Sequence, residues 1–114
     1  MNSAAPSLGH VARFTAEVRE ADSAHTLGNP GVHVLATPKL TEFCELAAQQ
    51  ACREMGRETR HMRIDIRHLA ATPVGDRIEI EAELVEMGEG RFVFSVRGRD
   101  SSRDIVSGRV ERVA

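Results

Sequence analysis

The sequence predicts an α+β domain in which one long helix packs against a five-stranded antiparallel sheet. Three observations carry this prediction. Only one segment, residues 34–55, shows the three- and four-residue spacing of apolar side chains that is typical of an amphipathic helix. One segment of alternating polarity precedes it, and four follow it. The last strands are joined by short turns, which favour antiparallel neighbours.

The predicted helix begins at the pair Thr37-Pro38. Proline fixes φ at an early helical position and biases Thr37 away from helical geometry, so the Thr37 hydroxyl is free to cap an open backbone N–H group. Gly56 supplies the stop signal. The apolar stripe consists of Leu40, Phe43, Cys44, Ala47, Ala48, Ala51 and Met55. We therefore expect one central helix with a single buried face.

The strands are predicted in the following order. Residues 11–18 alternate, and a polar loop over residues 21–31 then leads to the helix entrance, where a loop can be a lid or a simple connector. After the helix, strands are expected over residues 59–71, 78–84, 92–99 and 104–113. A strict two-residue period in the second strand places His68 on the inward face and His61 on the opposite one.

One helix covers only part of a five-stranded sheet, and an edge strand would remain open. A second copy of the chain would cover both the rest of the sheet and the open edge strand. We therefore expect a homodimer, and a dimer of dimers is the alternative.

The composition is that of one folded domain of 114 residues, with 41% hydrophobic and 28% charged residues. We expect a flexible tail over residues 1–9 and a single domain over residues 10–114. The net charge of −2 gives no electrostatic footprint for nucleic acid. No signal peptide or membrane-spanning run is recognised, and Cys44 and Cys52 lie too far apart on one helix to form a disulfide. These features favour a cytoplasmic protein.

Several kinds of site are not indicated by the sequence. The histidines lack metal-ligand spacing, no glycine loop resembles a phosphate cradle, and no serine lies in a nucleophile elbow. Cys44 lies in the apolar stripe, which favours packing over nucleophilic chemistry. No metal and no bound cofactor are expected.

Three residues remain as candidates for chemistry, each with an ordinary structural alternative. His68 ends an inward row of aliphatic residues, where a histidine is either a core residue bonded to a carbonyl or a functional group. Thr37 is explained by helix capping alone. Glu45 lies at the border of the apolar stripe, where a glutamate is usually just solvated.

The order of elements and two short motifs resemble acyl-CoA thioesterases of the hotdog fold, in the branch that contains fluoroacetyl-CoA thioesterase. The motifs are Val34-Leu35-Ala36-Thr37-Pro38 at the helix entrance and His68-Leu69-Ala70-Ala71-Thr72-Pro73-Val74-Gly75 at the end of the second strand. The similarity spans about residues 11–113. It implies a hotdog fold, with one long central helix wrapped by a five-stranded antiparallel sheet, and a dimer that binds the acyl thioester at the subunit interface.

The same resemblance implies a catalytic set of a threonine, a glutamate and a histidine, which match Thr37, Glu45 and His68. We add His61, Thr41 and Leu35 as predicted substrate-binding residues. Two positions depart from the family pattern. His61 stands where a glycine is common, so recognition of fluoroacetyl groups is not implied. The last strand reads Gly108-Arg109-Val110-Glu111-Arg112 where Gly-x-His-x-Arg is common.

The predicted function is hydrolysis of a small or medium acyl-CoA thioester, with coenzyme A as part of the substrate. Glu45 would activate a water or the Thr37 hydroxyl, His68 would steer the acyl group or stabilise charge, and the positive helix start would favour the oxyanion. Thr37 and Glu45 are about 12 Å apart along a helix, so the partner could come from a second subunit. The Thr41 hydroxyl is only one helical turn from Glu45, so it is the second candidate for the group that Glu45 activates.

A non-catalytic protein that binds acyl groups or other small ligands on the same dimer is the alternative, and the His61 departure is its best support. A hydratase is disfavoured because no Asp-x-x-x-x-His pairing is present.

Overall fold

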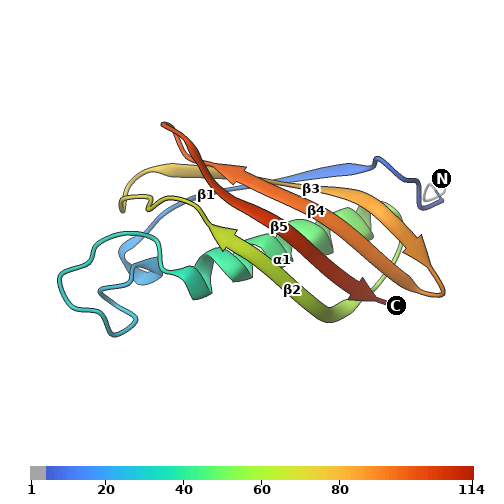
Figure 1. Ribbon diagram of the computed structural model, residues 1–114, viewed down its shortest axis with the longest axis horizontal. Coiled ribbons are helices and arrows are strands. Elements are labelled where there is room, and N and C mark those ends of the chain that lie inside the picture. The colour runs from blue at the N-terminus through green and yellow to red at the C-terminus, as the bar shows by residue number, and fades with distance from the viewer. Residues whose placement is uncertain (1–4) are drawn as a thin grey trace.

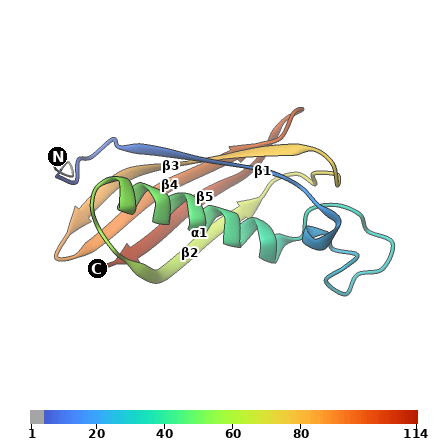
Figure 2. The same cartoon turned by 180° about the vertical axis from the view of Figure 1, so that it is seen from behind.

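A single long helix lies across one face of a five-stranded antiparallel sheet in the computed structural model, which describes residues 5–114 (Figure 1). The strands lie in the order β1-β3-β4-β5-β2, so β1 and β2 form the two edges. Figure 2 shows α1 against one face of this sheet. The elements are β1 (Val11–Glu17), a 3-10 turn η1 (Glu20–Asp22), α1 (Thr37–Glu54), β2 (Arg60–His68), β3 (Arg77–Gly88), β4 (Arg91–Arg99) and β5 (Asp104–Val113). The predicted α+β arrangement is confirmed.

The core lies between α1 and the facing side of the sheet. The whole predicted apolar stripe of the helix is buried, and so is the inward row of β3, formed by Ile78, Ile80, Ala82 and Leu84. Phe14 of β1 and Phe43 of α1 pack with ring centroids 5.5 Å apart. Removal of this apolar surface from water is the main force that holds the helix on the sheet.

The start of α1 differs from the prediction by one residue. Ala36 is the cap, in an extended conformation with φ −77° and ψ 144°, and no side chain caps the helix. Thr37 is already the first helical residue, so its predicted capping role is wrong. Its hydroxyl turns instead to His68. Gly56, with φ 75°, ends the helix as predicted.

Strand β2 contains a bulge that changes the faces of its residues. His61 lies opposite Arg112, but Arg63 lies opposite Glu111, so Met62 is an extra residue and is 49% exposed. One extra residue inverts the alternation of side chains. The prediction that His61 and His68 lie on opposite faces is therefore wrong, and both meet α1. Met62, predicted to face inward, turns outward.

The chain enters the sheet through residues 5–10. The Gly9 N–H group donates to the Leu84 carbonyl at 2.8 Å, and the Ser7 carbonyl accepts from His10 at 3.1 Å. Part of the predicted tail, residues 1–4, lies outside the described residues, so the tail remains a prediction. No helix in the described part of the chain is long and apolar enough to cross a membrane.

Candidate functional site

Thr37 and His68 meet at the entrance of the helix. The Thr37 hydroxyl and His68 Nδ1 are hydrogen-bonded at 2.8 Å, although 31 residues separate them in the chain. Thr37 is exposed on the first turn of α1, and His68 is half-buried at the end of β2. His68 Nε2 is buried and has no hydrogen-bond partner within residues 5–114. The pair therefore joins an accessible hydroxyl to an imidazole whose second nitrogen is unsatisfied within the described residues.

The chain before the helix is fixed by a short series of hydrogen bonds. The Leu35 N–H group donates to the Thr72 carbonyl at 2.8 Å, and the Thr72 hydroxyl donates to the buried Asp100 carboxylate at 3.0 Å. Asp100 also accepts from the backbone N–H groups of Ser102 and Arg103. Burial alone would raise the pKa of Asp100, but these donors outweigh it and lower the pKa below its ordinary value. The support under the helix entrance is thus an ionised, well-satisfied carboxylate.

Glu45 lies farther along α1 in a second cluster. Its Oε1 accepts from Arg112 Nη1 at 2.7 Å, and its Oε2 contacts His61 Nδ1. Arg112 also donates from Nε to the Thr59 hydroxyl at 2.8 Å and from Nη2 to the Thr59 carbonyl at 2.9 Å. The Arg112 side chain is only 6% exposed and that of Glu45 18%. Arg112, Glu45 and His61 therefore form one connected polar cluster on the inner face of the sheet.

Arg112 is the residue that sequence reasoning missed. It belongs to the inward row of β5 with Val106 and Val110, both fully buried. An arginine in such a row needs an acceptor, because a buried unpaired charge is costly. That signal was present in the alternation of the strand, and the border glutamate of α1 was the acceptor to look for.

The predicted residues thus fall into two groups within the single chain. Thr37 and His68 touch, whereas Glu45 lies two helical turns away, about 12 Å along the axis. Thr41 lies between them, and its hydroxyl donates to the Thr37 carbonyl at 2.9 Å. Leu35 is buried in the core.

The two cysteines of α1 are free and buried. Burial, with a smaller contribution from the charge of Glu45, raises the pKa of the Cys44 thiol to about 12. Burial also raises the pKa of Cys52. A thiol with so high a pKa is a poor nucleophile near neutral pH, which supports a packing role. Within residues 5–114, no three metal-binding side chains lie close enough to hold an ion.

The family model for the fluoroacetyl-CoA-specific thioesterase matches residues 4–114 of the chain. The chain belongs to this family. No curated protein sequence matches the chain. The family resemblance drawn from the two short motifs is therefore confirmed.

Solved structures of the family and its superfamily agree with this assignment. A mutant of the fluoroacetyl-CoA-specific thioesterase FlK, in complex with fluoroacetate and CoA, superposes with a TM-score of 0.86 at 25% identity, covering 95% of this chain and 94% of that chain. A thioesterase superfamily member from Thermus thermophilus gives a TM-score of 0.85 at 26% identity, over 94% and 82% of the two chains. A hot-dog-like protein from Thermanaerovibrio acidaminovorans, at 18% identity and a TM-score of 0.82, over 93% and 81%, shares the fold.

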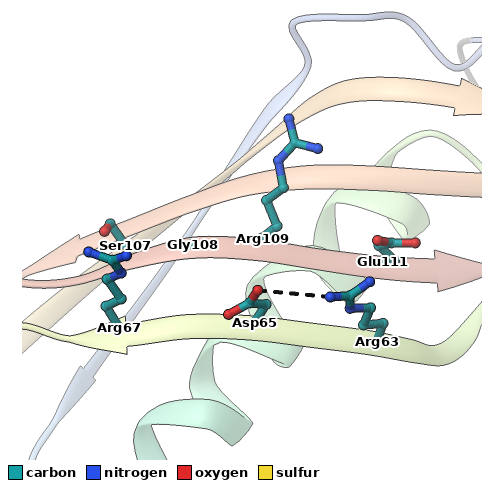
Figure 3. A pocket seen from close by; sticks show the side chains of 7 residues that line it. All are labelled: Arg63, Asp65, Arg67, Ser107, Gly108, Arg109 and Glu111. Atoms are coloured by element: carbon teal, nitrogen blue, oxygen red, sulfur yellow. Dashed lines mark ion pairs between the residues drawn. The ribbon is translucent and has the colours of Figure 1, made fainter.

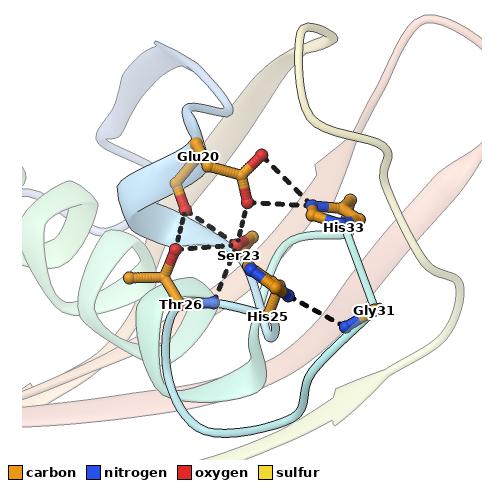
Figure 4. Close-up of polar contacts among 6 residues, drawn as sticks. All are labelled: Glu20, Ser23, His25, Thr26, Gly31 and His33. Carbon is orange, nitrogen blue, oxygen red and sulfur yellow. Dashed lines mark hydrogen bonds and ion pairs between the residues drawn. The ribbon is translucent and has the colours of Figure 1, made fainter.

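The loop between β1 and α1 of this family member is held by its own polar contacts (Figure 4). Ser23 donates to the Glu20 carboxylate at 2.7 Å, and His33 Nδ1 lies 3.0 Å from the same carboxylate. The Ser23 hydroxyl, followed by His33, lowers the pKa of Glu20. The rings of His25 and His33 stack with centroids 4.4 Å apart, and the Gly31 N–H group donates to His25. The loop beside the helix entrance is therefore internally ordered.

A hollow of about 410 Å³ lies away from all the predicted site residues. Figure 3 shows its side chains projecting from β2 and β5, on the sheet face that α1 does not cover. Its lining is of mixed charge: Arg63, Asp65, Arg67, Ser107, Gly108, Arg109 and Glu111. Because Arg63 pairs with Asp65 within this set, the hollow offers less net positive charge than its three arginines suggest.

Proposed function

We propose that the protein hydrolyses a small or medium acyl-CoA thioester in a pocket between two copies of the chain. The observation that carries this proposal is the hydrogen bond between Thr37 and His68 at the start of α1. It joins the two residues that match the threonine and histidine of the family's catalytic set. The FlK complex with fluoroacetate and CoA supports an acyl-CoA as the substrate class.

The second copy is proposed because it brings the two residue groups together. The outer edge of β2 pairs with no other strand of residues 5–114. β2 spans Arg60–His68, and antiparallel pairing with a second β2 about its middle would lay His61 of one copy near His68 of the other, within about a residue. Each pocket would then combine Thr37 and His68 from one protomer with Glu45 from its partner.

The proposed chemistry assigns a separate task to each group. Thr37 and His68 bind the thioester carbonyl, and the positive end of the α1 dipole stabilises the oxyanion that forms on it. His68 is already within hydrogen-bond distance of the Thr37 hydroxyl, so Glu45 is left to activate the attacking water. The water oxygen bonds to the carbonyl carbon, the C–S bond breaks, and the CoA thiolate takes up a proton.

The experiment compares Glu45→Ala and His68→Ala with the wild-type protein on short acyl-CoA thioesters. Both variants should stay folded and lose turnover by roughly 10²-fold or more, because each removes a group that acts in the transition state. Glu42→Ala is the matched control, since Glu42 is exposed on the same helix. Wild-type turnover in both test variants would contradict the assignment.

A non-catalytic acyl-binding protein is the second candidate. One observation favours it: both Glu45 oxygens are already engaged, by Arg112 and by His61. A panel of acyl-CoAs assayed for free thiol separates the two candidates. Thiol release supports the hydrolase, whereas saturable binding without release supports the carrier.

A further inference from the structure

The contact between His61 and Glu45 fixes which nitrogen of the imidazole is free. An ionised carboxylate can only accept hydrogen bonds, so His61 Nδ1 must carry the proton that it shares with Glu45 Oε2. The neutral ring then has its lone pair on Nε2. The His61 side chain is 55% exposed in the protomer, and its Nε2 is therefore open to a water or a substrate.

Arg112 holds the carboxylate in the orientation that this tautomer requires. It binds Glu45 Oε1 at 2.7 Å and is itself fixed by two bonds to Thr59. The exposure of the side chains thus increases along the series, from the buried Arg112 through Glu45 to the half-exposed His61. The same order of a fixed acid, an oriented histidine and a free nitrogen is how general bases are built in hydrolases.

We propose that His61 is the general base of the thioester hydrolysis, and that Glu45 is its positioning residue. The inference rests on the proposed function and changes the role of Glu45 within it. His61 Nε2 takes a proton from the attacking water as the water oxygen bonds to the carbonyl carbon. When the C–S bond breaks, the imidazolium returns that proton to the leaving thiolate. The net reaction converts thioester and water into carboxylate, thiol and one released proton.

The other histidine–glutamate contacts of the molecule lack this arrangement. His10 bonds Glu54 through Nε2 at 2.8 Å, and His33 contacts Glu20 in the loop at 3.0 Å. Neither acid is bound by a buried arginine among the described residues. The charged groups that face His61 are Glu45 from α1 and Arg112 from β5. In the proposed dimer, His68 of the second copy would join them.

The test uses His61→Gly, which removes the imidazole and leaves Glu45 and Arg112 in place. His61→Gly should lose roughly 10²-fold in kcat, and added free imidazole should restore part of the rate. His10→Gln, which removes a histidine beyond the cluster, is the control and should behave as wild type.

Each outcome decides the matter. If His61→Gly keeps wild-type turnover, Glu45 acts directly and the inference falls while the proposed function stands. If the rate falls and imidazole rescues none of it, His61 is structural and the inference again falls. If wild type releases no thiol from any acyl-CoA, the proposed function fails and takes the inference with it.

Discussion

The two polar regions along α1 differ in how completely they are satisfied. At the middle of the helix, both oxygens of Glu45 are engaged, one by His61 and one by Arg112, and the arginine is almost fully buried. At the entrance, Thr37 and His68 form a single hydrogen bond, and the buried Nε2 of His68 has no partner in the described part of the chain. Folding of the single chain thus supplies both partners of the Glu45 carboxylate, whereas it leaves one nitrogen of His68 without a hydrogen-bond partner among the described residues.

Such a difference is informative because orphaned buried polar atoms are rare and need an explanation. A ligand or a second protein copy at the entrance would supply the missing partner for His68. The Glu45 carboxylate already has a partner on each oxygen, so the mid-helix cluster can orient one catalytic group. The predictions below disturb each region in turn, from the largest expected effect to the smallest.

Thr37→Val should break the entrance and leave the mid-helix cluster intact. The change removes only the hydroxyl that bonds His68, so we expect roughly a 10²-fold loss or more in kcat for thioester hydrolysis. The fold should be retained, and Thr37→Ser should keep most of the activity. Thr15→Val, on the exposed face of β1, is the control. Unchanged turnover in Thr37→Val would show that the entrance pair has no catalytic role.

Arg112→Ala should break the mid-helix cluster and affect stability as well as activity. It leaves the Glu45 charge partly buried without its main partner, which we expect to cost about 2–4 kcal/mol in the free energy of unfolding, discounted for the partial exposure of Glu45. Urea unfolding measures this. Arg97→Ala removes an exposed arginine that pairs with Glu81, and should cost less than about 1 kcal/mol. Equal losses in both would contradict a special role for the buried arginine.

Asp100→Ala tests the support beneath the entrance. The variant leaves the Thr72 hydroxyl and two backbone N–H groups without their acceptor, at a cost of about 1–3 kcal/mol. The pKa of Asp100 is lowered in the folded protein. The Asp100 carboxylate therefore stabilises the folded protein fully above its pKa in the unfolded chain, which is about 3.9. This stabilisation disappears as the pH falls through the lower pKa that Asp100 has in the folded protein. Unfolding measured between pH 7 and pH 3 should show the gap between the two proteins narrowing at the acid end. A constant gap would contradict this account.

His10→Ala should have the smallest effect, because it removes an ion pair with Glu54 at the far end of α1 from the entrance. Both side chains are partly exposed, so the loss should stay within about 1 kcal/mol. Thermal unfolding at low and high salt checks this. A loss as large as that of Arg112→Ala would contradict the claim that burial makes the mid-helix cluster more important for stability than an exposed ion pair.

The sequence predicted where the helix and the strands lie in the chain, but it did not predict which side chains of different elements meet. The apolar stripe predicted the buried face of α1, and alternation predicted β5 over residues 104–113, where the structure has it. The bulge at Met62 could not be foreseen, because no glycine or proline marks it and the alternation continues through it. That one extra residue turned His61 toward Glu45. The Thr37 hydroxyl was predicted to be a cap because local signals cannot show a partner 31 residues away.

The central claim is that each catalytic pocket takes Thr37 and His68 from one copy and Glu45 from the other. It is tested most directly by a heterodimer of Thr37→Val and Glu45→Ala, coexpressed with two tags and purified through both. Each variant alone should be nearly inactive. The heterodimer contains one intact composite pocket, so it should recover about half of the wild-type thiol release. A heterodimer that forms but stays as inactive as its parents would contradict the claim.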